Sequence, residues 1–98
     1  MLDFYFIAEE ISKPINEPLG LDFAGDLDNK TFANLQKKGI IDDRFDYYSD
    51  FRWSKLILNQ IRERIDRKQM HFDTDVIKLL RLINTALETK SDLIAYGD

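Results

Sequence analysis

The side chains that could carry chemistry gather in one short stretch of this 98-residue chain. Five of the twelve aromatic residues fall between Phe45 and Trp53, and aspartates are interleaved with them. The acids of this stretch are Asp42, Asp43, Asp46 and Asp50. Paired carboxylates can act as acid and base in hydrolysis, whereas tyrosine and tryptophan are enriched at the energetic centres of protein interfaces. The stretch therefore raises two hypotheses, a hydrolytic site and a partner-binding surface.

The hydrolytic hypothesis lacks supporting residues elsewhere in the chain. Sequence spacing does not fix the distance between Asp42 and Asp46, because an extended and a turned segment would place them differently. The chain has no cysteine, and we expect its single histidine, His71, to be a surface or half-buried loop residue. The four glycines are scattered, so they form no phosphate-binding loop. We expect a protein without catalytic residues, with a small hydrolase that uses the clustered aspartates as an alternative.

The one segment with a metal-loop pattern is better explained as the start of a helix. Residues 26–31 begin like a calcium-binding loop, but Lys30 occupies a ligand position and Thr31 the position that needs glycine. Asp28 instead has the type and place of a helix N-cap. A transition-metal site needs several histidine, cysteine or carboxylate ligands, and one histidine supplies too few. We therefore expect neither a metal nor a cofactor.

Charge and hydropathy argue against nucleic acid or a membrane as the partner. The net charge is −4, and Glu63 and Asp66 interrupt the cations of the predicted second helix. A phosphate-binding face would have to overcome both features. No apolar run approaches the roughly 20 residues that span a bilayer. Residues 1–7 lack a basic leader and the chain has no cysteine, which together predict a cytoplasmic location.

The acidic and aromatic stretch instead favours a protein partner. Residues 1–51 carry five Lys/Arg against eleven Asp/Glu, whereas residues 52–98 carry nine against seven. Clustered charge steers association with a partner of opposite sign. We predict a non-enzymatic, acidic protein-binding module, in its most concrete form an inhibitor or immunity-type protein that neutralises a basic partner such as a nuclease. The predicted partner-binding residues are Asp42, Asp43, Asp46, Tyr47, Tyr48 and Asp50.

The same aromatic residues could also fill the core, so we expect Phe45, Phe51 and Trp53 inside and Tyr47 or Tyr48 more accessible. Another function stays open: a homodimeric structural or adaptor subunit that associates through an uncovered helix face. Leu56 falls on the polar side of its predicted helix. Together with any uncovered part of the third helix, it would form that interface. Salt separates the two functions, because a charge-steered complex weakens as ionic strength rises and an apolar dimer barely responds.

The first half of the chain predicts one strand and one well-capped helix. Residues 2–8 alternate in the period of two that is typical of a strand. Two prolines make residues 12–20 an extended connector, and residues 19–24 could add a short strand. A helix is predicted over residues 29–38, because Asp28 can cap its start and Gly39 can end it, with Ile40 folding back onto Leu35.

The second half predicts two longer helices and a final strand. The second helix is expected to start at a cap on Ser49 or Asp50 and to run to about Lys68, with Phe51 on its apolar face. The third starts at Asp73 or Thr74, and its wide apolar stripe makes it the most central element. Residues 93–96 suggest a short strand or a docked tail. We predict a single α+β domain over residues 1–98, with three helices, the last two long and antiparallel, packed with a small sheet of the N-terminal strand and the C-terminal segment.

Overall fold

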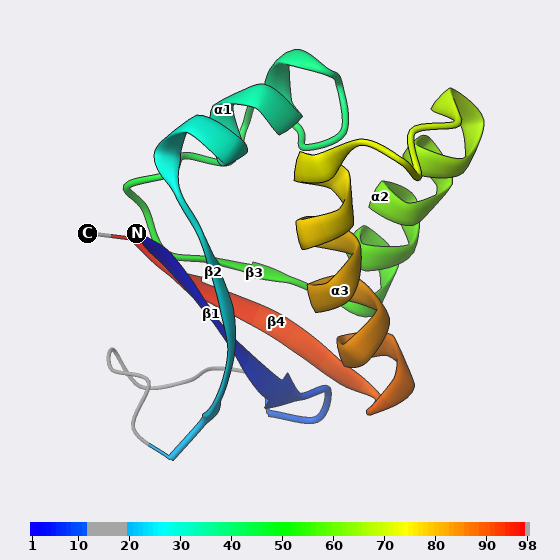
Figure 1. Ribbon diagram of the computed structural model, residues 1–98. Coiled ribbons are helices and arrows are strands. Elements are labelled where there is room, and N and C mark those ends of the chain that lie inside the picture. Colours follow the sequence, from blue (N-terminus) through cyan, green and yellow to red (C-terminus); the bar gives the residue numbers. More distant parts are fainter. Residues whose placement is uncertain (12–19, 98) are drawn as a thin grey trace.

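The computed structural model of the chain describes residues 1–11 and 20–97 (Figure 1). Its elements in chain order are β1 (Leu2–Ala8), β2 (Asp22–Leu27), α1 (Asn29–Lys37), β3 (Phe51–Trp53), α2 (Lys55–Lys68), α3 (Thr74–Glu88) and β4 (Ser91–Tyr96). The α+β class and the three helices are confirmed, and α2 and α3 run antiparallel (Figure 1). Both prolines of the predicted connector lie outside the described residues.

The four strands form one antiparallel sheet in the order β2-β1-β4-β3. β1 and β4 pair from Asp3 opposite Tyr96 to Ala8 opposite Ser91, which confirms the predicted pairing of the N-terminal strand with the C-terminal segment. The short strand expected at residues 19–24 is β2, which starts at Asp22 and continues to Leu27. The sheet is larger than predicted, because β2 and β3 each add an edge strand.

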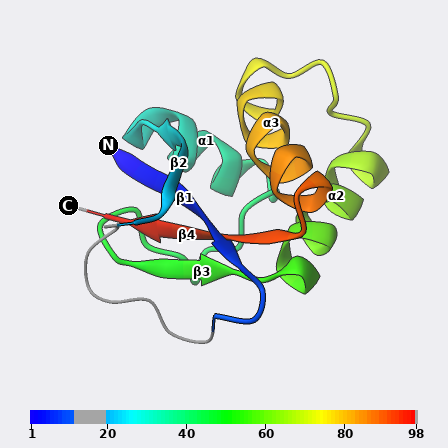
Figure 2. The same ribbon diagram turned by 90° about the horizontal axis from the view of Figure 1, so that it is seen from below.

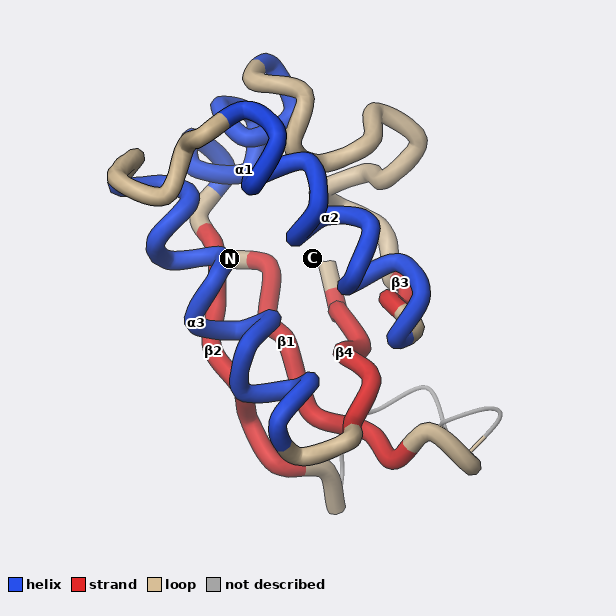
Figure 3. The backbone as a smooth tube through the Cα atoms, turned by 90° about the vertical axis from the view of Figure 1, so that its right-hand side faces the viewer, coloured by secondary structure: helices blue, strands red, loops and turns tan. Residues whose placement is uncertain are grey.

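The core lies between the sheet and the helices, which occupy one side of it (Figure 3). Phe4, Leu93 and Trp53 project from three different strands to this side and are buried. They belong to one apolar cluster with the stripes of the two long helices, Leu58, Ile61, Ile65, Val76, Leu79 and Ile83. Gly25 of β2 gives α3 room to approach, since a Cβ on this glycine would lie 2.7 Å from the Leu82 Cδ2 atom.

α1 forms as its sequence predicts. The Asp28 carboxylate accepts a hydrogen bond of 2.7 Å from the Thr31 N–H, so it satisfies one of the free donors at the helix start. Gly39 has a φ of 75°, and the Ile40 N–H donates to the Leu35 carbonyl at 2.9 Å. This is the left-handed C-terminal stop that was expected.

α2 starts later than predicted, and the prediction of a cap at Ser49 or Asp50 is wrong. Ser54 is the N-cap, and its hydroxyl accepts from the Ile57 N–H at 3.5 Å. Phe51 and Trp53 belong instead to β3, opposite Ala95 and Leu93 of β4. Residues two apart share one face of a strand, so both rings can reach the core, whereas on a helix they would point about 200° apart. The pairing with β4, some forty residues away, decides the conformation.

α3 and β4 complete the fold. Asp73, one of the two residues predicted to cap α3, is its N-cap and accepts hydrogen bonds from the Asp75 and Val76 N–H groups at 3.0 and 3.2 Å. Lys38, at the end of α1, forms ion pairs with Asp73 and Asp75 at 2.7 and 3.1 Å, so it ties the two helix ends together. None of the described helices has the length and apolar character needed to cross a membrane.

Candidate functional site: the acidic–aromatic loop

The predicted partner-binding residues lie in the loop that joins α1 to β3, here called the acidic–aromatic loop and comprising residues 42–50. Two of its rings anchor it to the core. The Phe45 ring lies 5.0 Å from that of Phe51 and 5.8 Å from that of Trp53. The Tyr47 ring lies 5.7 Å from that of Phe32 on α1. Both anchors are partly buried, so they fix the loop more than they present a binding surface.

Tyr48 is the aromatic residue that the loop presents to solvent, with 60% of it exposed. Its ring stands perpendicular to that of Tyr47, with 5.1 Å between the ring centroids. Its hydroxyl accepts a hydrogen bond of 3.2 Å from the Asn29 amide at the start of α1. Two contacts therefore hold an exposed ring in place, and an immobilised aromatic side chain loses less entropy on binding.

Three of the four loop carboxylates also shape the loop. Asp42 accepts from the Arg44 N–H at 2.9 Å and Asp46 from the Tyr48 N–H at 3.0 Å, the pattern in which an aspartate closes a turn with the backbone two residues ahead. Asp50 accepts from the Gly97 N–H at 3.0 Å. A carboxylate has about four acceptor positions, so these exposed groups keep lone pairs directed at solvent.

The C-terminal end of β4 packs against the loop backbone. A Cβ on Gly97 would lie 2.5 Å from the carbonyl carbon of Tyr48 and 2.7 Å from the carbonyl oxygen of Tyr47. Only glycine fits such an approach without movement. Burial raises the pKa of the neighbouring Tyr96 hydroxyl, and the negative charge of Asp50 raises it further. The loop is thus held from both sides, by α1 and by the end of β4.

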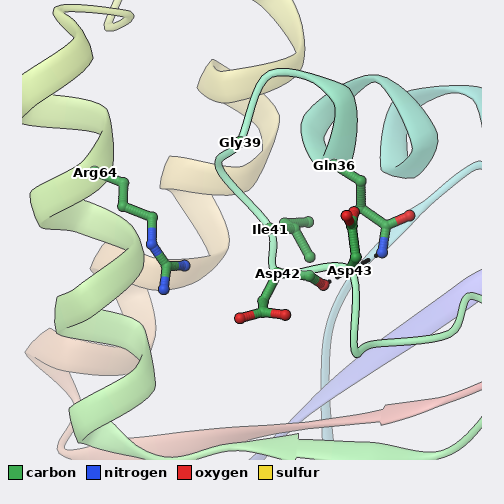
Figure 4. A pocket seen from close by; sticks show the side chains of 6 residues that line it. All are labelled: Gln36, Gly39, Ile41, Asp42, Asp43 and Arg64. Atoms are coloured by element: carbon green, nitrogen blue, oxygen red, sulfur yellow. Dashed lines mark hydrogen bonds between the residues drawn. The ribbon is translucent and has the colours of Figure 1, made fainter.

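The structure divides five of the six predicted residues into two groups, while the sixth, Tyr47, packs on Phe32. Asp46, Tyr48 and Asp50 lie at the Asn29 and Gly97 end of the loop. Asp42 and Asp43 line a separate shallow depression of about 290 Å³ together with Gln36, Gly39, Ile41 and Arg64 (Figure 4). In Figure 4 the Asp42 carboxylate is on the α2 side, and the Asp43 carboxylate is beside Gln36.

The depression is supported by two polar side chains from neighbouring helices. The Gln36 amide donates to the Phe45 carbonyl at 2.7 Å and to the Asp42 carbonyl at 3.3 Å. The Arg64 guanidinium donates to the Ile40 carbonyl at 3.2 Å and leaves its other N–H groups without a described partner. Drug-sized ligands occupy pockets of about 300–1,000 Å³. The depression is therefore large enough for one side chain or a small fragment.

The loop carboxylates lack counter-charges among the residues that the structure describes. None of the four forms an ion pair with any described cation, whereas Asp73 and Asp75 pair with Lys38, and Asp92 pairs with Arg52 at 2.8 Å. Arg44 is the cation within the loop, and its guanidinium lies 4.8 Å from the centre of the Phe45 ring. Four carboxylates against one arginine leave the loop with a charge of −3. The loop is a fixed, negatively charged surface around one exposed tyrosine.

Two residues that hold the loop in place, Asn29 and Gly97, were not predicted from the sequence. Asn29 looks like an ordinary first residue of a helix, and Gly97 is separated by more than forty positions from the loop that it contacts. His71 lies far along the chain in the α2–α3 connection, where its exposed ring is 2.7 Å from the Asp66 carboxylate. Across the described residues, no group of three or more histidine, aspartate or glutamate side chains is placed to hold a metal ion.

Comparison with protein-family models, with curated proteins and with solved structures finds no match to this chain.

Proposed function

We propose that the chain is a non-enzymatic protein-binding module that binds a basic partner protein through the acidic–aromatic loop, with Tyr48 as the anchor. The observation that carries this proposal is the loop's composition in space: a 60% exposed tyrosine on a fixed backbone, surrounded by carboxylates without an ion-pair partner among the described residues. An inhibitor or immunity-type protein that neutralises a basic enzyme such as a nuclease would need such a surface.

Two physical properties of the loop support this function. Tyrosine is enriched among the residues that contribute most to binding, because it combines a large ring with a hydroxyl group and few rotatable bonds. The uncompensated carboxylates would attract a basic partner over distances of about 10 Å at physiological salt and would raise its association rate. Asp42 and Asp43 beside the depression would then contact a second side chain of the same partner.

The homodimer alternative has weaker support from the exposed apolar residues. Leu56 is 68% exposed at the start of α2 and Phe72 is 94% exposed beyond its end. Fourteen helical residues span about 21 Å, so these two side chains are too far apart to form one contiguous patch. Scattered single apolar residues are normal on a protein surface. No comparable observation favours the hydrolase alternative.

The proposal is tested by capture of partners from lysate with matched baits. Asp46→Asn with Asp50→Asn removes two charges but keeps side-chain oxygens that can accept the Tyr48 and Gly97 N–H groups, so the loop should stay folded. Tyr48→Ala removes the anchor. The control Glu63→Gln with Asp66→Asn removes the same charge from α2.

We expect the wild type and the control to capture the same basic protein at about 0.05 M salt and to lose it at about 0.5 M, because screening weakens exposed charge pairs. Both loop variants should capture at least tenfold less of it, which corresponds to about 1.4 kcal/mol. Equal capture by the loop variants and the control would refute the proposal.

A further inference from the structure

The face of the sheet that points away from the helices carries a row of aromatic rings. The Tyr5 ring of β1 lies 5.4 Å from that of Phe23 on β2 and 5.8 Å from that of Tyr96 on β4, in edge-to-face geometry. Tyr5, Phe23 and Tyr96 are called the outer aromatic row here. In Figure 2 the helices lie on the other side of the strands. Phe23, the second residue of β2, is 55% exposed although it is large and apolar.

Two carboxylates border this row. Asp3 of β1 and Asp26 of β2 are direct cross-strand partners, and Asp3 is also the partner of Tyr96. Like charges directly opposite one another destabilise a sheet, with Cβ atoms about 5 Å apart. Neither carboxylate forms an ion pair with a described residue. At the other end of the face, Arg52 is already occupied, since it pairs with Asp92 and donates to the Ala8 and Ile11 carbonyls.

The outer aromatic row is continuous with the acidic–aromatic loop. Tyr96 is followed by Gly97, which donates to Asp50 and packs on the backbone of Tyr48. Strands are about 4.8 Å apart, so β2, β1 and β4 place Asp26 within about 10 Å of Tyr96. One partner surface of ordinary size, about 800 Å² per side, would cover both regions at once.

We infer that the outer aromatic row continues the docking surface of the loop, and that its occupant is an arginine-bearing segment of the basic partner. This inference rests on the proposed function and extends it to the sheet. A guanidinium group can stack on an exposed ring such as Phe23 and at the same time donate hydrogen bonds to carboxylates such as Asp3 and Asp26. Lysine, which is a compact point charge, would satisfy the acids but would gain less from the rings.

Charge repulsion also disfavours a homodimer that forms through this face of the sheet. An isologous dimer brings the same patch of both subunits together. Asp3 and Asp26 of both subunits would then lie in the same interface, so four carboxylates without an ion-pair partner among the described residues would share it. A cationic partner removes this repulsion, including the repulsion between Asp3 and Asp26 that exists in the free protein.

The test uses octa-arginine as the probe and three matched double variants of the chain. Each variant removes one aromatic ring and one charge: Phe23→Thr with Asp26→Asn on the sheet, Tyr48→Thr with Asp46→Asn in the loop, and Phe72→Thr with Glu63→Gln near the α2–α3 end. Dissociation constants come from calorimetry at low salt, and the contacted residues come from amide chemical-shift changes. Octa-lysine is titrated in parallel.

We expect the Phe72/Glu63 control to bind like the wild type and the sheet variant to bind about fivefold to tenfold more weakly, through the loss of one cation–π contact and one charge pair. Amide shifts should gather at residues 3–5, 23–26 and 46–50, and octa-arginine should bind more tightly than octa-lysine. If the sheet variant does not fold, Asp26→Asn alone, at an exposed position, should weaken binding at least twofold and replaces it.

The outcomes separate the two ideas. A sheet variant that binds like the control overturns the inference, and a weakened loop variant in the same experiment would leave the proposed function standing. A weakened sheet variant beside an unchanged loop variant would remove the proposed role of Tyr48 and keep the sheet-face site. Shifts spread evenly over all acidic residues would show unspecific charge attraction and overturn the inference. A dimer that strengthens with salt and is lost in the sheet variant would assign the face to a second copy and overturn it as well.

Discussion

Replacing Gly97 with alanine is the most direct test of how the loop is held. The added Cβ would lie 2.5 Å from the Tyr48 carbonyl carbon, 2.7 Å from the Tyr47 oxygen and 2.8 Å from the Ser49 nitrogen. All three are backbone atoms, so no side-chain rotation can relieve the overlap. The φ angle of Gly97 is not in the left-handed region, so the cost arises from space alone.

The magnitude follows from the two ways in which the overlap can be relieved. If the chain end stays in place, overpacking costs about 1–3 kcal/mol. If residue 97 moves away, the Gly97–Asp50 hydrogen bond is lost, which costs about 0.5–1.5 kcal/mol. The molecule takes the cheaper route, so we expect Gly97→Ala to lower the free energy of unfolding by about 1 kcal/mol. The midpoint of thermal unfolding should fall by about 4–8 °C for a chain of this size.

Urea unfolding combined with amide spectra distinguishes this explanation from a general destabilisation. Asp50→Ala removes the acceptor without adding bulk and isolates the hydrogen bond. Because both changes act through one contact, Asp50→Ala should cost much less in the Gly97→Ala background than in the wild type. The amide signals of residues 47–50 should move in Gly97→Ala, and those of α2 and α3 should not. An unfolding free energy within 0.3 kcal/mol of the wild type, with unmoved signals at residues 47–50, would refute the reasoning.

Three further changes test other parts of the structure. Ser54→Ala should lower the free energy of unfolding by about 0.5–1 kcal/mol in urea unfolding, because Ser54 caps α2. Ser49→Ala should change it by less than about 0.5 kcal/mol. Equal effects of the two substitutions would contradict the observed helix start. In thermal unfolding, Trp53→Phe should lower the free energy of unfolding by no more than about 1 kcal/mol and Trp53→Ala by about 3–5 kcal/mol. The indole N–H is buried without a described partner, so phenylalanine keeps most of the packing and loses no hydrogen bond. A large destabilisation by Trp53→Phe would reveal a partner for that group. Asp73→Asn should destabilise the chain at neutral pH, because the Lys38 hydrogen bond holds the pKa of Asp73 below its usual value and the charge therefore stabilises the fold above about pH 4. Between pH 7 and pH 2, the difference in unfolding free energy between this variant and the wild type should shrink below about pH 4. A difference that stays constant would contradict this explanation.

The elements that were predicted correctly are the ones whose signals are local. α1 carries its start at Asp28 and its stop at Gly39 within twelve consecutive positions, and both act through hydrogen bonds to residues three to five positions away. The prediction for the residues of β3 was wrong for the opposite reason. Three residues are too few to show a period, and their conformation depends on Leu93 and Ala95, which no local pattern connects to them.

The candidate site was predictable as a composition but not as an arrangement. The alternation of rings and acids marked the loop, and the expected burial of Trp53 and accessibility of one of the two tyrosines agree with the structure. Tyr47 is packed on Phe32, so the sequence alone could not say which of the two tyrosines points outward. The separation of Asp42 from Asp46 depends on Phe45 turning the chain into the core between them, which is a consequence of tertiary packing.

The distribution of charge over the elements gives the proposed interface a direction. The three helices hold nine of the fourteen Lys/Arg and only four of the eighteen Asp/Glu, so the rest of the chain holds five against fourteen. The two halves of the sequence differ less in charge than the helices differ from the rest of the chain, because positive helices and negative strands and loops alternate along the chain. A molecule with its negative charge on the sheet and loops and its positive charge on the helices would turn in the field of a basic partner until Tyr48 and the outer aromatic row face it. Neutralising cations on the helices should therefore change the association rate much less than neutralising the same number of carboxylates on the loop and the sheet.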